Sequence, residues 1–377
     1  MKEIKTIGIV GFGVMGAAIG LNAAMAGYDV VYKELNDDLV KSMFDKWVVA
    51  SLKKRVEKKK ITQEQMDQLM GKISGTSQYQ DLAPCDLVIE AAVEKMDLKK
   101  EIFKDLGQHC SADAILVSNT STFPIESLMQ GVPGQERTAG LHYFFPANVN
   151  KLVEVIRQKA TDDDTYQALM AFAEKNRKVP ITVKDFPGFA VNPLFIASYM
   201  ILDDFIGPDC NVATLDDVSR QALDVKFGIM WVQNAAGLGT SYHAAVSMTD
   251  YLRESDTGYP SVPRSLTEQF SINAPWVLDD GPVSSDQTLR KNIRDRLLGG
   301  IFSMASHLVD KGVVSVGDLE LGVCTALAWP KGPFSMMNDL GMEETRRLIT
   351  VSVAAGDFKL PGRFASGSPD PWEIPGK

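Results

Sequence analysis

Cysteine is scarce in this sequence of 377 residues, and the four that occur are widely separated. Cys85, Cys110, Cys210 and Cys324 form no C-x-x-C motif and no Cys/His cluster, so the sequence predicts neither a disulfide framework nor a structural zinc site. We expect these thiols to be buried or incidental, and we expect no bound metal.

Long apolar runs and an excess of positive charge are also missing. No apolar run reaches the roughly 18 to 20 residues needed to cross a bilayer, and the first residues, MKEIKTIGIVGFG, lead straight into a strand pattern without signal-peptide architecture. We therefore expect a cytoplasmic protein without a membrane partner. The formal net charge of −9 argues against a nucleic-acid binder, because such proteins need an excess of Lys and Arg.

The sequence alternates strand and helix patterns up to about residue 185. An apolar run at 6–10, a small-residue helix at 14–26 and a second strand at 28–32 form a βαβ unit. A charged helical stretch follows from residue 36 to about 60. The short apolar runs at 86–90 and 114–118 are typical of parallel strands buried on both faces. This pattern predicts an α/β fold with a doubly wound, Rossmann-type sheet.

Long helical patterns rich in Met, Leu and Ala take over after residue 185. We expect a nucleotide-binding domain at 1–185, a first helical module at 186–250, an irregular Ser/Pro/Asp-rich linker at 251–287 and a second helical module at 288–377. The segment 213–223 weakly resembles 314–324, which predicts two related modules in an all-α C-terminal region.

A glycine-rich turn directly after the first strand opens the first helix, with the sequence Gly11-Phe12-Gly13-Val14-Met15-Gly16. Glycines in this pattern permit a tight turn and a close backbone approach to a pyrophosphate, and the helix N-terminus favours negative charge. The turn predicts a dinucleotide site formed by Gly11, Gly13, Val14, Met15 and Gly16.

Glu34 ends the second predicted strand, about 20 residues beyond the glycines, where an acidic side chain binds a ribose 2′-hydroxyl and repels a 2′-phosphate. The sequence therefore predicts NAD rather than NADP as the cofactor. Glu34 could instead be a solvated carboxylate at a strand end, and the adjacent Lys33 leaves NADP open.

Hydride transfer between a secondary alcohol and nicotinamide requires a base for the hydroxyl proton. His142, in the segment GLHYFFPANVNKLVEV, is the candidate for that base. Glu154 could orient the imidazole and stabilise its charged form, as acids do in other histidine-based sites.

Four segments carry a resemblance to a known family: VIEAAVEKMDLKKEIF, SNTST, GLHYFFPANVNKLVEVI and KDFPGFAVN. Together they resemble L-3-hydroxyacyl-CoA dehydrogenases, and KELN and SLKKRVEKKKIT look most like the dehydrogenase part of the bacterial fatty-oxidation multifunctional protein. The resemblance covers nearly the whole chain. It implies an NAD-dependent oxidoreductase of fatty acid β-oxidation that acts on an acyl-CoA.

The resemblance also implies a role for particular residues. His142 is the base, Glu154 is its partner, and Ser121 and Asn192 hydrogen-bond the substrate oxygen. The nicotinamide end of the cofactor is contacted by Glu94, Lys99 and Asn119, and coenzyme A by Ser51, Lys58 and Lys59.

Simpler interpretations remain open for several of these residues. Ser121 could cap a helix, and Glu94 with Lys99 could be a surface pair on one helix. The lysines around Lys58 and Lys59 could be a solvated helix face.

The sequence departs from the family at two places. Where the family usually has H-F-F-N-P, this chain has HYFFP, so Phe145 replaces an asparagine. The sequence predicts a shortened turn after Gly228 in the first module, whereas the second keeps the W-P-x-G-P pattern. These changes predict an unusual acyl group.

Two rival functions stay open: a dehydrogenase of a free 3-hydroxy acid such as a sugar acid, and a non-catalytic relative like the lens crystallins. Family members with one helical module commonly pair through it. We therefore expect either a homodimer or a monomer in which the tandem modules satisfy that contact.

Overall fold

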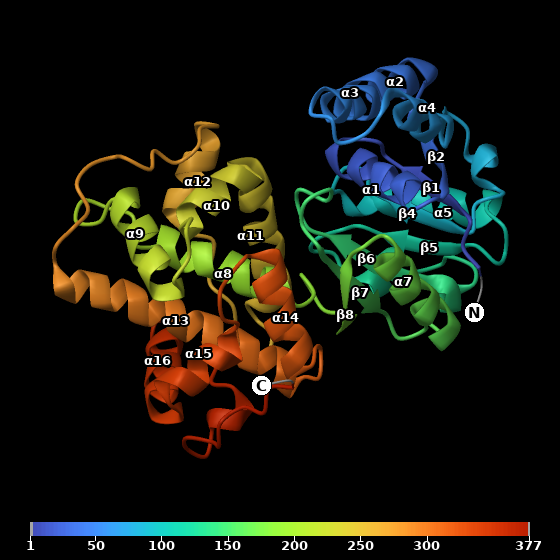
Figure 1. Cartoon of the computed structure of the whole chain (residues 1–377). Helices are drawn as coiled ribbons and strands as arrows, with labels where there is room; N and C mark the ends of the chain where they lie inside the picture. Colours follow the sequence, from blue (N-terminus) through green and yellow to red (C-terminus); the bar gives the residue numbers. More distant parts are fainter. Residues whose placement is uncertain (1–2, 376–377) are drawn as a thin grey trace. The chain divides into compact units, whose positions relative to one another are not determined.

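The computed structural model describes residues 3–375, and its contacts divide the chain between Asp185 and Phe186 into two compact units. The first unit combines a sheet with helices, and the second is built from helices, as the blue-to-green and green-to-red parts of Figure 1 show. Within the described residues, no helix is both long and apolar enough to cross a membrane.

The first unit is built on an eight-stranded sheet with the order β3-β2-β1-β4-β5-β6-β7-β8. Neighbouring strands are parallel except β6 and β7, which are antiparallel. The order reverses between β1 and β4, and sheets of this kind bind ligands outside the carboxyl ends of the strands at such a point. The strands are β1 (Thr6–Val10), β2 (Asp29–Lys33), β3 (Ile73–Thr76), β4 (Leu87–Glu90), β5 (Ile115–Ser118), β6 (Thr138–Tyr143), β7 (Leu152–Arg157) and β8 (Val179–Lys184).

Helices cover both faces of these strands. Ile9 of β1 and Ile89 of β4 belong to a core that also contains residues of α1 and α7. Val88 precedes Ile89 in β4, so its side chain is on the opposite face of the sheet, and it is fully buried as well. Burial on both faces is expected of parallel strands with flanking helices. The helices are α1 (Val14–Met25), α2 (Asp37–Met43), a π-helical turn (Phe44–Val49), α3 (Ala50–Glu57), α4 (Gln63–Gly71), α5 (Met96–His109), α6 (Ile125–Leu128) and α7 (Asp163–Lys175).

The predicted doubly wound sheet is confirmed. The strands expected at 6–10, 86–90 and 114–118 correspond to β1, β4 and β5. The helical stretch expected from residue 36 starts where Asn36 caps α2, because its Oδ1 accepts a hydrogen bond of 2.9 Å from the Leu39 N–H. That stretch is not one regular helix, since the π-helical turn separates α2 from α3.

The second unit is formed around one long helix, α13. A Cβ atom on Gly299 would lie 2.2 Å from the carbonyl oxygen of Leu348 in α16, and one on Gly300 would lie 2.3 Å from Cδ1 of Ile201 in α8. Glycine therefore permits α13 to pack closely on both neighbours. The helices are α8 (Val191–Asp203), α9 (Val212–Leu223), α10 (Ile229–Ala236), α11 (Leu238–Leu252), α12 (Arg264–Ser271), α13 (Gln287–Asp310), α14 (Val316–Ala326), α15 (Pro333–Leu340) and α16 (Met342–Ala354).

The starts of three consecutive helices occur twice in the second unit at a constant separation of 104 positions. In each copy, the side chain of the residue before the first helix caps that helix. A glycine with an extended backbone precedes the second helix, and a glycine with a positive φ precedes the third. The pairs are Asn211 and Ser315 before α9 and α14, Gly228 and Gly332 before α10 and α15, and Gly237 and Gly341 before α11 and α16.

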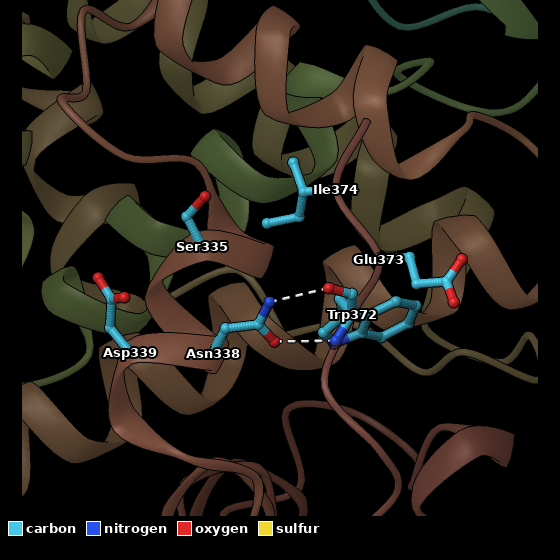
Figure 2. A pocket seen from close by; sticks show the side chains of 6 residues that line it. All are labelled: Ser335, Asn338, Asp339, Trp372, Glu373 and Ile374. Carbon is cyan, nitrogen blue, oxygen red and sulfur yellow. Dashed lines mark hydrogen bonds between the residues drawn. The ribbon is translucent and has the colours of Figure 1, made fainter. Parts of the chain in front are cut away.

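A side-chain contact is duplicated together with these helix starts. In Figure 2, the Asn338 Nδ2 donates to the Trp372 carbonyl at 2.9 Å, and the Asn338 Oδ1 accepts from the Trp372 N–H at 2.8 Å. Asn234 makes the same two bonds with Trp276, at 2.8 and 2.9 Å. The two predicted modules are thus related in structure.

The register of the predicted repeat is wrong by three positions. The helix starts pair Ala213 with Gly317, whereas the sequence comparison aligned it with Val314. What repeats is a set of capping and turn residues whose roles depend on backbone geometry, and these roles are filled by different amino acids in the two copies.

The predicted shortening after Gly228 is also wrong. The Asp216 Oδ1 accepts from the Trp231 N–H at 2.9 Å, and the Glu320 Oε1 accepts from the Ser335 N–H at 2.8 Å at the corresponding place. Both turns therefore have the same length, and Gly228 is the counterpart of the glycine in the W-P-x-G-P turn of the second module.

The stretch 251–287 is irregular over most of its length, as its composition predicted, but it is not a loose linker. It contains α12, and two of its aromatic residues, Tyr259 and Trp276, are buried in the second unit. The Tyr259 hydroxyl donates to the Pro193 carbonyl at 2.8 Å, and the Trp276 Nε1 donates to the Gln233 Oε1 at 2.8 Å. Ser, Pro and Asp here supply turns and caps around packed aromatic anchors.

Candidate active site

The turn after β1 has the geometry that a pyrophosphate needs. Gly11 has a φ of 87°, and a Cβ on it would lie 2.8 Å from the backbone of Ala92. A Cβ on Gly16 would lie 2.0 Å from the Gly11 carbonyl oxygen, whereas one on Gly13 would meet nothing within 4 Å. The backbone therefore packs tightly on one side and faces open space on the other, which fits a dinucleotide at the N-terminus of α1.

Glu34 follows β2 directly and belongs to this turn. Its Oε1 accepts a hydrogen bond of 2.6 Å from the Phe12 N–H, so the carboxylate lies beside the glycines. The neighbouring Lys33 is buried, with its ammonium 4.2 Å from the centre of the Tyr79 ring, and burial lowers the pKa of Lys33. Glu34 is thus the charged group bonded to the turn.

His142 and Glu154 are in direct contact. The two residues are opposite each other in the antiparallel pair β6–β7, and the His142 Nδ1–H donates to the Glu154 Oε2 at 2.6 Å. Both side chains are buried, at 4% and 0% exposure. Since Nδ1 is engaged by the carboxylate, Nε2 is the ring nitrogen suited to exchange a proton.

The loop after His142 is held by two side chains that belong to none of the recognised motifs, Lys178 and Asn22. The Lys178 Nζ donates to the carbonyls of Ala147 and Asn150 at 2.5 and 2.8 Å, and the Asn22 Nδ2 of α1 donates to the same Ala147 carbonyl at 2.9 Å. Burial lowers the pKa of Lys178 to about 8. Asn22 of α1 and Lys178, the residue before β8, thereby fix the loop that carries Phe145, which is 57% exposed.

The SNTST segment follows β5 and is bonded to its neighbours on two sides. The Asn119 Oδ1 accepts from the Tyr143 N–H at 2.9 Å, next to His142 on β6. The Ser121 N–H donates to the Glu94 Oε1 at 3.1 Å. The segment therefore connects the end of β6 to the loop between β4 and α5.

Ser121 does not cap α6, so the simpler interpretation of this serine is wrong. The first N–H groups of α6, those of Ile125 and Glu126, donate to the Asp185 carboxylate at 2.8 and 2.7 Å. This contact gives the KDFPGF motif a structural role, because its aspartate attaches the end of β8 to the helix that follows SNTST.

Glu94 and Lys99 are not a surface pair on one helix. Glu94 precedes α5, and Lys99 is 1% exposed with its Nζ 2.6 Å from the Glu90 Oε1 and 3.2 Å from the Glu94 Oε2. Glu90 was missed at the sequence level because a carboxylate at the end of an apolar run resembles a solvated strand end. Its full burial is visible only in the structure.

The remaining predicted residues lie in different parts of the chain. Ser51 is in the first turn of α3, and Lys58 and Lys59 are exposed residues just beyond its end. Asn192 is the second residue of α8 and belongs to the second unit. In the part of the chain that the structure describes, no three His, Cys, Asp or Glu side chains are grouped to hold a metal ion.

A doubly wound sheet with a G-x-G-x-x-G turn and a buried His–Glu pair defines a nicotinamide-dependent oxidoreductase. A family model described as "3-hydroxyacyl-CoA dehydrogenase, NAD binding domain" matches residues 6–186. A 3-hydroxybutyryl-CoA dehydrogenase from Bradyrhizobium diazoefficiens is 35% identical over 241 residues, which cover 63% of this chain and 81% of that protein. The chain belongs to the 3-hydroxyacyl-CoA dehydrogenase family, and its cofactor is NAD.

Two further comparisons concern the length and the fold of related proteins. The fatty acid oxidation complex subunit alpha of Idiomarina loihiensis is 32% identical over 260 residues, which cover 69% of this chain and 35% of that protein. The chain thus matches about a third of the length of this larger relative. The crystal structure of a 3-hydroxybutyryl-CoA dehydrogenase from Escherichia coli has the same fold, with a TM-score of 0.82 at 21% identity over 94% of this chain and 95% of that chain.

Proposed function

We propose that this protein interconverts an L-3-hydroxyacyl-CoA and a 3-oxoacyl-CoA with NAD as the hydride carrier. The observation that carries the proposal is the buried contact of 2.6 Å between the His142 Nδ1 and the Glu154 Oε2 on neighbouring strands. A histidine held in this way is a base for a hydroxyl proton in oxidation and an acid for the oxyanion in reduction.

The residues of the chain divide the work between proton transfer and positioning. His142 removes the proton of the 3-hydroxyl group through Nε2, while Glu154 stabilises the imidazolium that results. The bound cofactor would supply the acceptor for the hydride that leaves C3, the carbon that carries this hydroxyl group. Ser121 and Asn192 hydrogen-bond the substrate oxygen in this proposal, and Asn119, Glu94 and Lys99 serve the nicotinamide end of the site.

The thioester half of the substrate is assigned to α3 and the turn after it. Coenzyme A carries a 3′-phosphate and a pyrophosphate, and the exposed residues Lys58 and Lys59 offer positive charge at the end of the helix that carries Ser51. A solvated helix end is the alternative role of these lysines. Neutralising both should weaken CoA binding under this proposal and leave it unchanged under the alternative.

The acyl half of the substrate is assigned to the loop after His142. Phe145 is exposed on the loop after His142, where the family pattern has an asparagine. An exposed aromatic ring on a loop held by Lys178 and Asn22 favours apolar contact over hydrogen bonding to the acyl group. We therefore expect a preference for an acyl group with a bulky apolar part, such as a branched or cyclic one.

The experiment that tests the proposal measures NADH oxidation against a panel of 3-oxoacyl-CoA thioesters and the matching free 3-oxo acids. We expect turnover of thioesters and formation of the L (3S) alcohol. Turnover of the free acids alone would favour the rival hydroxy-acid dehydrogenase, and preferential use of the D isomer would remove the protein from this chemistry. Complete inactivity with intact NADH binding would favour a non-catalytic relative.

Cofactor preference gives a second test at the other end of the site. Because the Glu34 carboxylate lies at the glycine turn, it should repel a 2′-phosphate, and kcat/KM should be far higher with NADH than with NADPH. Glu34→Gln should narrow this ratio, mainly by improving the use of NADPH. Equal kcat/KM values for the two cofactors in the unaltered protein would contradict the assignment of Glu34.

A further inference from the structure

Glu90 is a fully buried carboxylate that the proposed proton transfer does not use. It is the last residue of β4 and pairs in register with Val10 of β1 and Ser118 of β5. It therefore lies at the carboxyl ends of the strands, at the point where the strand order reverses and a dinucleotide binds.

Three donors from three segments bind the Glu90 carboxylate. Its Oε1 accepts from the Lys99 Nζ at 2.6 Å and from the Ala92 N–H at 2.7 Å, and its Oε2 accepts from the Ser118 hydroxyl at 2.6 Å. Both oxygens act as acceptors, as in an ionised carboxylate. Ala92 is also the residue that a Cβ on Gly11 would meet, so Glu90 supports the wall of the cofactor turn.

Lys99 contacts a second carboxylate, that of Glu94, in addition to Glu90. Its Nζ lies 3.2 Å from the Glu94 Oε2, and the side chain of Glu94 is 37% exposed. Two carboxylates and one ammonium leave the Glu90–Lys99–Glu94 cluster with one net negative charge. This excess charge is only partly screened by water, because two of the three side chains are buried.

The cluster lies on the side of the sheet that serves the nicotinamide half of the cofactor. Glu34 marks the end of β2 as the adenosine side, and the second nucleotide half of such a fold lies over the strands beyond the reversal point, here β4, β5 and β6. The Glu94 Oε1 also accepts from the Thr120 hydroxyl and the Ser121 N–H, at 2.5 and 3.1 Å. The cluster thus borders the segment assigned to the substrate oxygen.

We propose that the net negative charge of the Glu90–Lys99–Glu94 cluster favours binding of the oxidised cofactor over the reduced one, an inference that rests on the proposed function for the place of the nicotinamide ring. That ring is positively charged in NAD⁺ and neutral in NADH. A fixed negative charge near it attracts NAD⁺ without a matching gain for NADH. Glu90 is then a positioning and charge-balancing residue, and it sets the ratio of the two cofactor affinities.

The test is a set of binding titrations without any thioester, so it is independent of the proposed reaction. Glu90→Gln removes one negative charge and should raise the ratio of the NAD⁺ Kd to the NADH Kd at least about fivefold, mainly by weakening NAD⁺. Lys99→Met leaves two negative charges and should change the ratio in the opposite direction. A purely structural role would weaken both nucleotides together in both variants.

Three controls separate charge from damage to the fold. ADP-ribose, which lacks the nicotinamide ring, should bind Glu90→Gln about as well as the unaltered protein. Glu101→Gln, an exposed site on α5, makes the same charge change outside the cluster and should leave the ratio unchanged. If Glu90→Gln does not fold, Glu94→Gln should raise the ratio in its place. An unchanged ratio in a folded cluster variant would overturn the proposal.

Discussion

His142 is on β6 and the glycine turn follows β1, so proton transfer and cofactor binding depend on different strands of one sheet. His142→Gln should lower kcat by about 10²- to 10⁴-fold, the usual contribution of a general base, and leave the NADH Kd nearly unchanged. Steady-state kinetics with a 3-oxoacyl-CoA and a fluorescence titration with NADH measure the two quantities separately.

Glu154→Gln tests the same site with a smaller expected loss of activity. It keeps a hydrogen-bond acceptor for Nδ1 but removes the negative charge, so kcat should fall less than in His142→Gln and the pH optimum of turnover should move. A His142→Gln protein with near-normal kcat would show that another group is the base, and the rival functions would then be reopened.

Asp203, at the end of α8, provides a prediction about stability that is independent of the active site. Burial raises the pKa of this carboxyl to about 8, while the Gln233 amide donates to its Oδ2 at 2.9 Å. Near neutral pH the folded state holds a proton that the unfolded chain releases. The contribution of Asp203 to stability therefore falls as pH rises from about 4 to about 8, by up to about 1.4 kcal/mol per unit.

Asp203→Asn should abolish this pH dependence, because the amide is neutral in both states and can still accept from Gln233. The variant should be more stable than the unaltered protein at pH 7.5 and gain little at pH 4.5. Urea unfolding of both proteins at the two pH values measures the difference, and parallel stability profiles would count against a raised pKa at this site.

At the scale of elements, the close approach of α13 to α16 depends on the absence of a side chain. A Cβ on Gly299 would lie 2.2 Å from a backbone oxygen, which cannot rotate away, so Gly299→Ala should cost about 1 to 3 kcal/mol or more. Gly71→Ala is the matched control, since a Cβ at that helical position meets nothing within 4 Å. It should be neutral or raise stability by up to about 1 kcal/mol.

Thermal or urea unfolding of both glycine variants measures this contrast. A Gly299→Ala protein as stable as Gly71→Ala would mean that the helices of the second unit can separate without cost. The helix packing described around α13 would then have to be looser than the structure shows.

At the scale of the whole molecule, the two tandem modules affect whether the chain forms a dimer. Helix α13 of the second module packs on α8 and α9 of the first, so the two modules cover part of each other's surface within the same chain. We expect a monomer in light scattering after size-exclusion chromatography at micromolar concentration. A stable dimer would show that the modules leave another surface for pairing.

The sequence by itself determined the sheet class, the cofactor turn and the identity of the base candidate. The glycine pattern is local, because its function depends on the backbone freedom of Gly11 and the helix that starts three residues later. The apolar runs of β1, β4 and β5 are local as well, since burial on both faces favours consecutive apolar residues within each strand, with the polar residues at the strand ends. The catalytic motif was found by resemblance, and spacing alone did not place Glu154 beside His142.

Only the tertiary structure decided the contacts between segments that are distant in the sequence. The pairing of β6 with β7 brings Glu154 to His142, and the burial of Glu90 becomes visible once α5 places Lys99 against the end of β4. The register of the helical modules also depended on geometry, because an asparagine and a serine can cap equivalent helices. Local patterns depend on residues that are neighbours in the sequence, whereas charge balance and packing depend on residues that only folding brings together.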